Sequence, residues 1–160
     1  MTTYTAPLRD MRFVLHELFD VPGQLSSLSG FEEAGADVMD AVLEECAKLC
    51  QEVLHPINQS GDEEGCVFKD GAVTMPKGFK EAYKKYADGG WCGLTASPEY
   101  GGQGLPEALD YLVAEMVGSA NLSLGLYPGL TQGTITALTA IRKRITCPNS
   151  SAASGKVRCV

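Results

Sequence analysis

The chain has 160 residues, of which 44% are hydrophobic, so its length and composition fit one domain of ordinary size with its own core. Its formal net charge of −7 at pH 7 argues against nucleic acid as a partner, because binding to phosphates needs a basic surface. No apolar run approaches the ~20 residues that span a bilayer, and the first residues lack a secretory pattern, so we expect a cytoplasmic protein without a membrane span.

Two helices are predicted in the first third of the chain. Residues 7–19 carry apolar side chains at helical spacing, and Val21-Pro22-Gly23 should end that helix. Residues of about 31–54 predict a longer helix, because one face holds Val38, Val42, Cys46, Leu49 and Val53. We expect it to stop at His55-Pro56, since the residue before a proline avoids the helical region.

The next segment predicts a polar loop, a small hairpin and a third helix. Residues 58–66 are polar, and Asp70-Gly71 lies between two short apolar segments, which is typical of a tight β-hairpin. Its arms are too short to build a sheet core. Residues of about 77–87 then predict a helix with an apolar stripe of Phe79, Tyr83 and Tyr86.

Residues 89–106 form a glycine-rich segment, with six glycines and two prolines in eighteen residues. Gly102-x-Gly104 before a helix suggests a phosphate-binding loop, but the third glycine of a dinucleotide fingerprint would fall at Glu107. No Gly-Lys-Ser or Gly-Lys-Thr follows either. We therefore interpret this segment as a structural loop, in which glycines allow tight turns and close backbone approach.

Two further helical segments are predicted after the glycine-rich segment. Residues of about 106–119 predict a helix that Asn121 caps or breaks. Residues 122–140 are apolar nearly all round, so a helix there should be interior, and Pro128-Gly129 should kink or split it. The elements together predict an all-α fold of five or six helices with one small β-hairpin.

The side chains that could carry chemistry suggest neither a catalytic residue nor a metal site. Cys46 and Cys50 lie one helical turn apart and would hold a metal only if two further ligands converged, so we favour two small residues on a buried face. His16 and His55 lack a nucleophile at a recognisable motif, and the acidic pairs are typical of solvated surfaces. The residues alone therefore indicate a helical domain with one unusual loop.

Several segments, in the same order, resemble the acyl-CoA dehydrogenase family. They are residues 90–94, 98–106 with their Pro-Glu-Tyr-Gly-Gly-Gln-Gly run, 119–122 and 127–133. Residues 4–11 and the loop at 61–65 are similar to a larger subfamily, which includes enzymes resembling methylthiopropanoyl-CoA dehydrogenase. The resemblance covers residues of about 4–140 and implies the amino-terminal helical domain, a five- to six-helix orthogonal bundle.

The resemblance also implies a function for the complete enzyme. In that family, two helical domains and a middle β-domain enclose FAD and an acyl-CoA thioester. A glutamate removes the α-proton, the β-hydride goes to the flavin, and an electron-transferring flavoprotein accepts the electrons. The amino-terminal domain supplies one wall of the acyl pocket, which by position would consist of Leu124, Gly125, Tyr127, Pro128, Thr131 and Gln132. Plain helix packing is the alternative for each of these residues.

The resemblance ends near Ala140, which suggests a domain at 1–140 and an aberrant tail at 141–160. The tail carries five basic residues and no acid, whereas residues 1–140 carry 8 basic and 20 acidic side chains, a balance of −12. One interpretation is a reading-frame shift near residue 140. Suitable codons for residues 147–155 read, one base earlier, as Leu-Pro-Lys-Leu-Val-Ser-Gly-Glu-Trp, which is similar to a family segment. The other interpretation is a naturally divergent, disordered basic tail.

Two functional hypotheses follow from this truncated resemblance. In the first, the chain is an enzyme fragment that lacks the flavin domain and the catalytic glutamate, binds no FAD, is inactive alone and self-associates. In the second, it is a stand-alone helical binding or interaction module with an apolar groove around residues 122–133.

Overall fold

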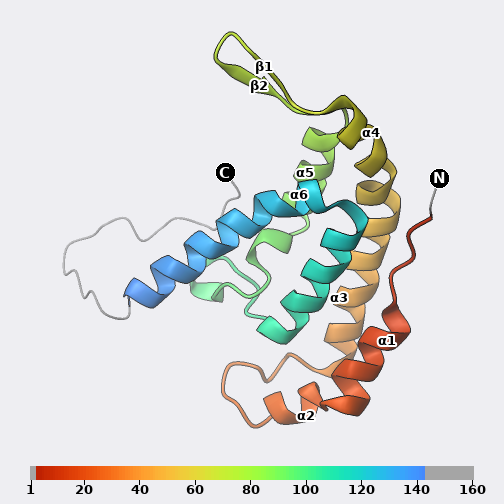
Figure 1. Cartoon of the computed structure of the whole chain (residues 1–160). Coiled ribbons are helices and arrows are strands. Elements are labelled where there is room, and N and C mark those ends of the chain that lie inside the picture. Colours follow the sequence, from red (N-terminus) through yellow and green to blue (C-terminus); the bar gives the residue numbers. More distant parts are fainter. Residues whose placement is uncertain (1–2, 143–160) are drawn as a thin grey trace.

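The computed structural model describes residues 3–142 of the chain. It is mostly helical and has one two-stranded antiparallel hairpin, which confirms the predicted fold class (Figure 1). No helix within residues 3–142 combines the length and the apolar character needed to cross a membrane. The predicted tail falls outside the described residues, apart from Ile141 and Arg142 at the end of the last helix.

The first predicted helix is present as α1, Leu8–Arg12, followed by a π-helical segment, Phe13–Leu18. Val21-Pro22-Gly23 does end this helix, but it also begins the short α2, Val21–Leu25. Pro22 lies in the first turn, where its missing N–H costs nothing, and the Asp20 carboxylate accepts a hydrogen bond from the Gly23 N–H at 3.3 Å.

A long helical column replaces the predicted helix and polar loop. α3, Ala36–Leu49, continues through a π-helical segment, Cys50–Leu54, a 3₁₀ turn, His55–Ile57, and α4, Asn58–Glu64. The expected stop at His55-Pro56 is therefore wrong. Pro56 lies at the start of the 3₁₀ turn, a position that does not require its N–H, so the polar residues after it remain helical.

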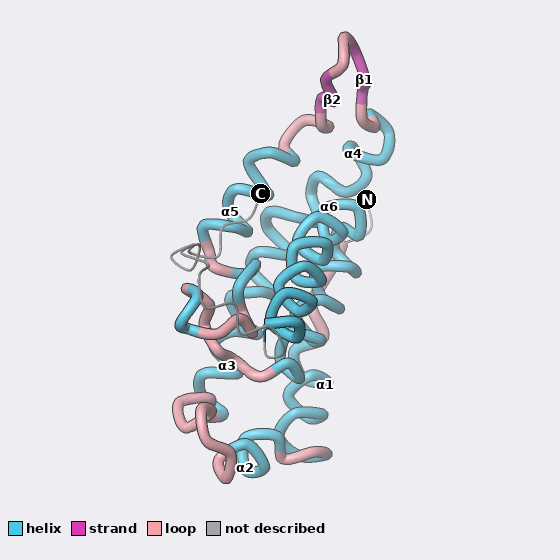
Figure 2. Tube along the Cα trace, turned by 90° about the vertical axis from the view of Figure 1, so that its left-hand side faces the viewer, coloured by secondary structure: helices cyan, strands magenta, loops and turns pink. Residues whose placement is uncertain are grey.

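The hairpin formed by β1, Val67–Lys69, and β2, Ala72–Thr74, has the predicted turn. Phe68 pairs with Val73, and Asp70 and Gly71 both have positive φ angles, 52° and 80°, as a two-residue turn of this kind requires. Both strands are exposed and project beyond the helices, which confirms that the hairpin adds little to the core (Figure 2). α5, Phe79–Asp88, follows it.

The last helix, α6, spans Glu107–Arg142 and is broken at Asn121, where the backbone is non-helical with φ −160° and ψ 90°. The predicted split at Pro128 does not occur, because the helical backbone runs through it. The second half, residues 122–142, is not interior. Leu122, Leu126, Leu130 and Leu138 are 63%, 61%, 76% and 63% exposed. A helix that is apolar nearly all round needs other apolar surfaces to cover it. The pattern does not show that the same chain provides those surfaces.

The core lies between the α3 column, α1, α5 and the first half of α6. Its fully buried side chains include Met39, Leu43, Leu54, Leu109, Met116 and Leu124. Cys46 and Cys50 are also fully buried, with their Sγ atoms 3.9 Å apart, as the apolar interpretation predicts. Within residues 3–142 no three His, Cys, Asp or Glu side chains are placed to hold a metal ion.

Candidate functional site

The six residues proposed for the acyl wall separate into three places, because successive helical residues point in different directions. Leu124 is fully buried in the core. Tyr127 and Thr131 line a large cavity on one side of α6. Gly125, Pro128 and Gln132 line a smaller cavity on another side. The structure therefore brings only two of the six to the larger opening.

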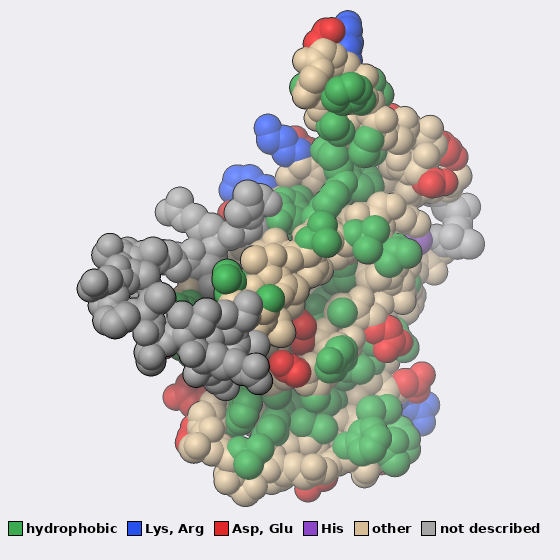
Figure 3. Space-filling view, turned by 60° about the vertical axis from the view of Figure 1, so that its left-hand side comes forward, with side chains coloured by type: hydrophobic (Ala, Val, Ile, Leu, Met, Phe, Trp, Pro, Cys, Tyr) green, Lys and Arg blue, Asp and Glu red, His purple; other side chains and the backbone are tan. Residues whose placement is uncertain are grey.

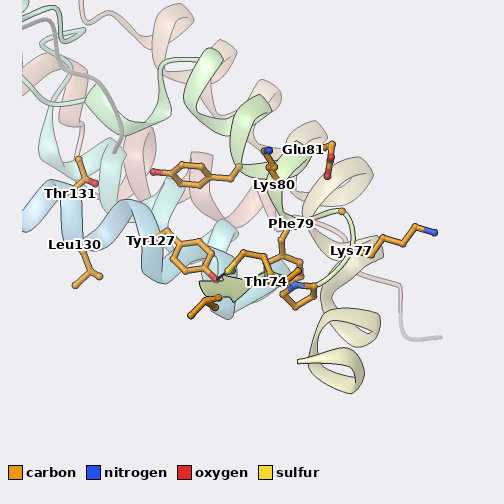
Figure 4. Close-up of a pocket in the computed structure, with 13 residues that line it drawn as sticks. Thr74, Lys77, Phe79, Lys80, Glu81, Tyr127, Leu130 and Thr131 are labelled. Atoms are coloured by element: carbon orange, nitrogen blue, oxygen red, sulfur yellow. Dashed lines mark hydrogen bonds between the residues drawn. The ribbon is translucent and has the colours of Figure 1, made fainter. Parts of the chain in front are cut away.

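The larger cavity, which we call the α5–α6 cavity, has a volume of about 750 Å³. It lies between the second half of α6, the strand β2 and the beginning of α5 (Figure 4). Its lining is mostly apolar and consists of Val73, Thr74, Met75, Pro76, Lys77, Gly78, Phe79, Lys80, Glu81, Tyr83, Tyr127, Leu130 and Thr131. A volume of this size falls within the ~300–1,000 Å³ of small-molecule sites.

Tyr127 is held at this cavity by two contacts. Its hydroxyl donates to Met75 Sδ at 3.6 Å, and its ring meets the Tyr83 ring edge-on, with centroids 6.0 Å apart. Burial, with a smaller contribution from the Cys66 thiol, raises the pKa of Tyr127 above its usual value. The phenol is therefore neutral at physiological pH, so it presents an aromatic face and no charge to the cavity.

The sequence interpretation did not include the part of the lining that comes from β2 and α5. The sequence places Phe79 and Tyr83 only in an apolar stripe, and it gives Met75 no role. In the view of Figure 3, hydrophobic side chains form a band that runs from the hairpin down over the helices beneath it. Spacing along the chain indicates that Phe79 and Tyr83 share a face of their helix, but not which part of α6 they meet.

The smaller cavity has a volume of about 180 Å³ and lies where the two halves of α6 approach each other. An added Cβ on Gly125 would come within 3.1 Å of the Val117 side chain, so the helices pack closely there. Gln132 donates to Thr95 Oγ1 at 2.8 Å. These contacts support helix packing as the role of Gly125 and Gln132.

One carboxyl group also faces the smaller cavity. Burial, followed by the charge of Glu107, raises the pKa of Asp110 above its usual 3.8. A carboxyl group with a raised pKa is a candidate general acid or base, but carboxyl groups without a catalytic role show such shifts as well. The described residues that line this cavity include no second carboxyl group, so we assign Asp110 no catalytic role.

The glycine-rich loop binds its own backbone, as the structural interpretation predicts. Four successive N–H groups, those of residues 102–105, donate to carbonyls of Ser97, Gly93, Ala96 and Leu94 at 2.9–3.1 Å. A Cβ at Gly102 would lie 2.0 Å from the Ala96 carbonyl oxygen, so this close approach requires glycine. These amides are not available to a phosphate, and the loop therefore does not fit the pyrophosphate of FAD.

Comparisons with known proteins identify the family. Residues 37–143 match the acyl-CoA dehydrogenase N-terminal domain. The chain is 40% identical over 136 residues to the 3-methylmercaptopropionyl-CoA dehydrogenase of Ruegeria pomeroyi, covering 85% of this chain and 23% of that protein. It is 31% identical over 138 residues to a butyryl-CoA dehydrogenase of Syntrophomonas wolfei, covering 84% and 22%.

A third relative is more distant. The broad-specificity linear acyl-CoA dehydrogenase of Mycobacterium tuberculosis is 26% identical over 131 residues, covering 81% of this chain and 21% of that protein. The chain thus spans less than a quarter of the length of these relatives. Both the matched domain and the named relatives lead to one conclusion: the chain belongs to the acyl-CoA dehydrogenase family, whose members use FAD, and carries its amino-terminal helical domain.

Proposed function

We propose that this chain supplies one wall of the acyl pocket of an FAD-dependent acyl-CoA dehydrogenase, which introduces an α,β double bond into an acyl-CoA thioester. The observation that carries the proposal is the α5–α6 cavity, which Tyr127 and Thr131 line. Its apolar lining suits the hydrocarbon part of an acyl thioester. An acyl chain placed there would leave water, which is favourable in proportion to the apolar area buried.

The residues of this wall bind and exclude water, and we assign them no proton transfer. Met75, Phe79 and Leu130 offer apolar contacts, while the hydroxyl of Tyr127 is engaged by the Met75 sulfur. In the family, bound FAD accepts the hydride. We assign no loop within residues 3–142 to the binding of FAD. We therefore propose that the isolated chain neither binds flavin nor dehydrogenates an acyl-CoA.

The purified 160-residue chain tests two claims, that it lacks flavin and activity and that its α5–α6 cavity binds an acyl chain. It should be colourless and should not oxidise octanoyl-CoA in the presence of an artificial electron acceptor. Octanoyl-CoA should bind weakly, on the order of millimolar, and should shift amide NMR signals around Tyr127 and Thr131. CoA alone should leave those signals in place. A stoichiometric flavin absorption spectrum would contradict the proposal that the isolated chain binds no flavin. NMR shifts that CoA alone also produces would contradict the proposal that the acyl chain lies against this wall.

A pair of variants sharpens the measurement. Thr131→Trp puts a large ring into the α5–α6 cavity and should abolish the acyl-dependent shifts. Tyr111→Trp changes an exposed residue on the first half of α6, 72% exposed, and should not alter them. Equal behaviour of the two variants would contradict the assignment of the acyl chain to this cavity.

The second candidate function is a stand-alone binding module. The size of the α5–α6 cavity favours it, because about 750 Å³ is enough for a ligand without help from other domains. Saturable binding of octanoyl-CoA to the monomer at roughly micromolar concentration would support this module over the fragment. A cytoplasmic location, an electron-transferring flavoprotein as partner and self-association remain predictions.

A further inference from the structure

Two tyrosine rings meet at the α5–α6 cavity, one from each of the two helices that line it. Tyr83 lies on α5 and Tyr127 on the second half of α6, and both contribute to the lining. Their ring centroids are 6.0 Å apart, and their planes are nearly perpendicular, at 89°. Aromatic rings attract each other in this edge-to-face geometry, so the contact joins the two helices. We call it the tyrosine pair.

The tyrosine pair leaves no room for an acyl chain between its rings. A methylene group lies about 3.5–4.0 Å from the ring atoms that it contacts, so a chain between two rings needs centroids at least about 7 Å apart. The observed separation is shorter than that. A hydrocarbon chain therefore passes between the two rings only if one of them moves or is removed.

The pair also lies between two parts of the cavity lining. In the view of Figure 4, Leu130 and Thr131 lie on one side of Tyr127, and Phe79 lies on the other side. The acyl chain of the proposed function lies at Tyr127 and Thr131. Such a chain meets the tyrosine pair before it reaches Phe79.

Resting on the proposed function, we infer that Tyr83 is a specificity-determining residue that limits the length of the acyl chain in the α5–α6 cavity. A chain that ends before the tyrosine pair binds without disturbing it. A longer linear chain gains contact with Phe79 only by displacing the Tyr83 ring, so its additional methylenes add little affinity. The ligands that fit are acyl thioesters of short to medium chain length.

Tyr83 is the ring of this lining that can change with the least effect on the fold. Phe79 is only 3% exposed and packs closely on α4, where a Cβ on Gly61 would lie 2.3 Å from its ring. Tyr127 is held by its hydrogen bond to Met75 as well as by the tyrosine pair. Tyr83 is half-buried and does not belong to the buried core. Its side chain can therefore control the passage without supporting the domain.

Binding of octanoyl-CoA and dodecanoyl-CoA to the full 160-residue chain tests the inference. Four additional methylenes that were buried freely would tighten binding about 200-fold, at about fourfold for each. In the wild type, the tyrosine pair should hold this gain below about tenfold. Tyr83→Ala should increase the gain at least about tenfold, and it should leave the dissociation constant of octanoyl-CoA within about threefold of the wild type.

Three further variants separate the ring from other effects of the substitution. Tyr83→Phe keeps the ring and should behave like the wild type. Tyr83→Leu removes the ring but keeps an apolar side chain for folding, and it should act in the same direction as Tyr83→Ala. The control, Tyr111→Ala, truncates an exposed tyrosine on the first half of α6 and should leave both dissociation constants unchanged. Circular dichroism checks that each variant keeps its helices.

Amide NMR signals locate the end of the chain. Dodecanoyl-CoA should shift the signal of Phe79 in Tyr83→Ala but not in the wild type. The inference is overturned if Tyr83→Ala and Tyr83→Leu leave the gain unchanged, if the wild type already shows the full gain of about 200-fold, or if Tyr83→Phe behaves like Tyr83→Ala. The proposed function survives these results as long as octanoyl-CoA shifts the signal of Thr131 and CoA does not. The absence of that acyl-dependent shift overturns both.

Discussion

Asn121 is the only polar residue of the described chain whose side chain is fully buried, and it joins two distant elements. Its Nδ2 donates to the Leu54 carbonyl oxygen at 3.1 Å, in the α3 column. Its Oδ1 accepts from the Leu124 N–H at 3.0 Å, which caps the second half of α6. We predict that Asn121→Leu, which keeps a side chain branched at Cγ but removes both polar atoms, destabilises the protein strongly.

The magnitude follows from the two bonds. The substitution removes one hydrogen bond from the buried Leu54 carbonyl oxygen and the side-chain partner of the buried Leu124 N–H, and such losses cost about 1–3 kcal/mol each. Leucine is at least as large as asparagine, so no cavity adds to the loss. We therefore expect the free energy of unfolding to fall by about 2–5 kcal/mol, a large share of the ~5–15 kcal/mol of a typical domain.

Urea denaturation followed by circular dichroism measures this loss at low protein concentration. With a slope of about 1–2 kcal/mol per molar urea, the midpoint should fall by at least ~1 M, or the variant should be unfolded without urea. The matched control is Asn58→Leu at an exposed position of α4, for which we expect a change within about 0.5 kcal/mol. Equal effects of the two substitutions would refute the reasoning.

Asn121→Asp separates the two bonds. The carboxylate still accepts from the Leu124 N–H, but it faces the Leu54 carbonyl oxygen without a proton to donate. Burial and this repulsion raise its pKa in the folded state above the unfolded value of about 3.9. The variant should therefore be most stable below that value and lose stability as the pH rises through the raised folded pKa. A pH-independent difference from the wild type would contradict the proposed geometry.

The remaining predictions concern two glycines and one carboxylate. Gly61→Ala should destabilise by about 1–3 kcal/mol, because its Cβ would lie 2.3 Å from the Phe79 ring. Gly118→Ala, with an open contact of 3.8 Å, should stabilise by about 0.5–1 kcal/mol. Thermal unfolding of both variants compares the signs directly. Burial opposes ionisation of Asp40, but hydrogen bonds from His16 and Arg12 outweigh it and lower its pKa below 3.8. Its stabilisation is therefore present above the unfolded value and lost as the pH falls through the folded pKa. Asp40→Asn should remove this loss of stability at low pH, which thermal unfolding at a series of pH values measures.

Local signals explain the elements that the sequence predicts correctly. Asp70-Gly71 determines the hairpin, because both residues adopt positive φ angles that few others tolerate. Asn121 marks the break in α6, since its side chain can cap the next turn. The glycine-rich loop is likewise predictable as structural, although its internal bonding becomes visible only in three dimensions.

The wrong predictions share one cause, which is that they needed information about distant residues. Pro56 stops a helix by local rules, yet the column continues through a 3₁₀ turn packed on α6. The apolar content of residues 122–140 suggests an interior helix, although four of its five leucines are exposed in the described structure. Propensity describes a residue and its neighbours, whereas burial depends on what meets it from elsewhere in the chain.

By itself, the sequence determined the helical class, the position of the hairpin, the break at Asn121 and the family. These depend on spacing, turn chemistry and motif order over a few residues. Only the tertiary structure decided that Asn121 bonds to a carbonyl 67 residues away, and that Tyr127 and Thr131 open to a cavity while Leu124 enters the core. Such contacts join segments far apart in the chain, so no local pattern along α6 can specify them.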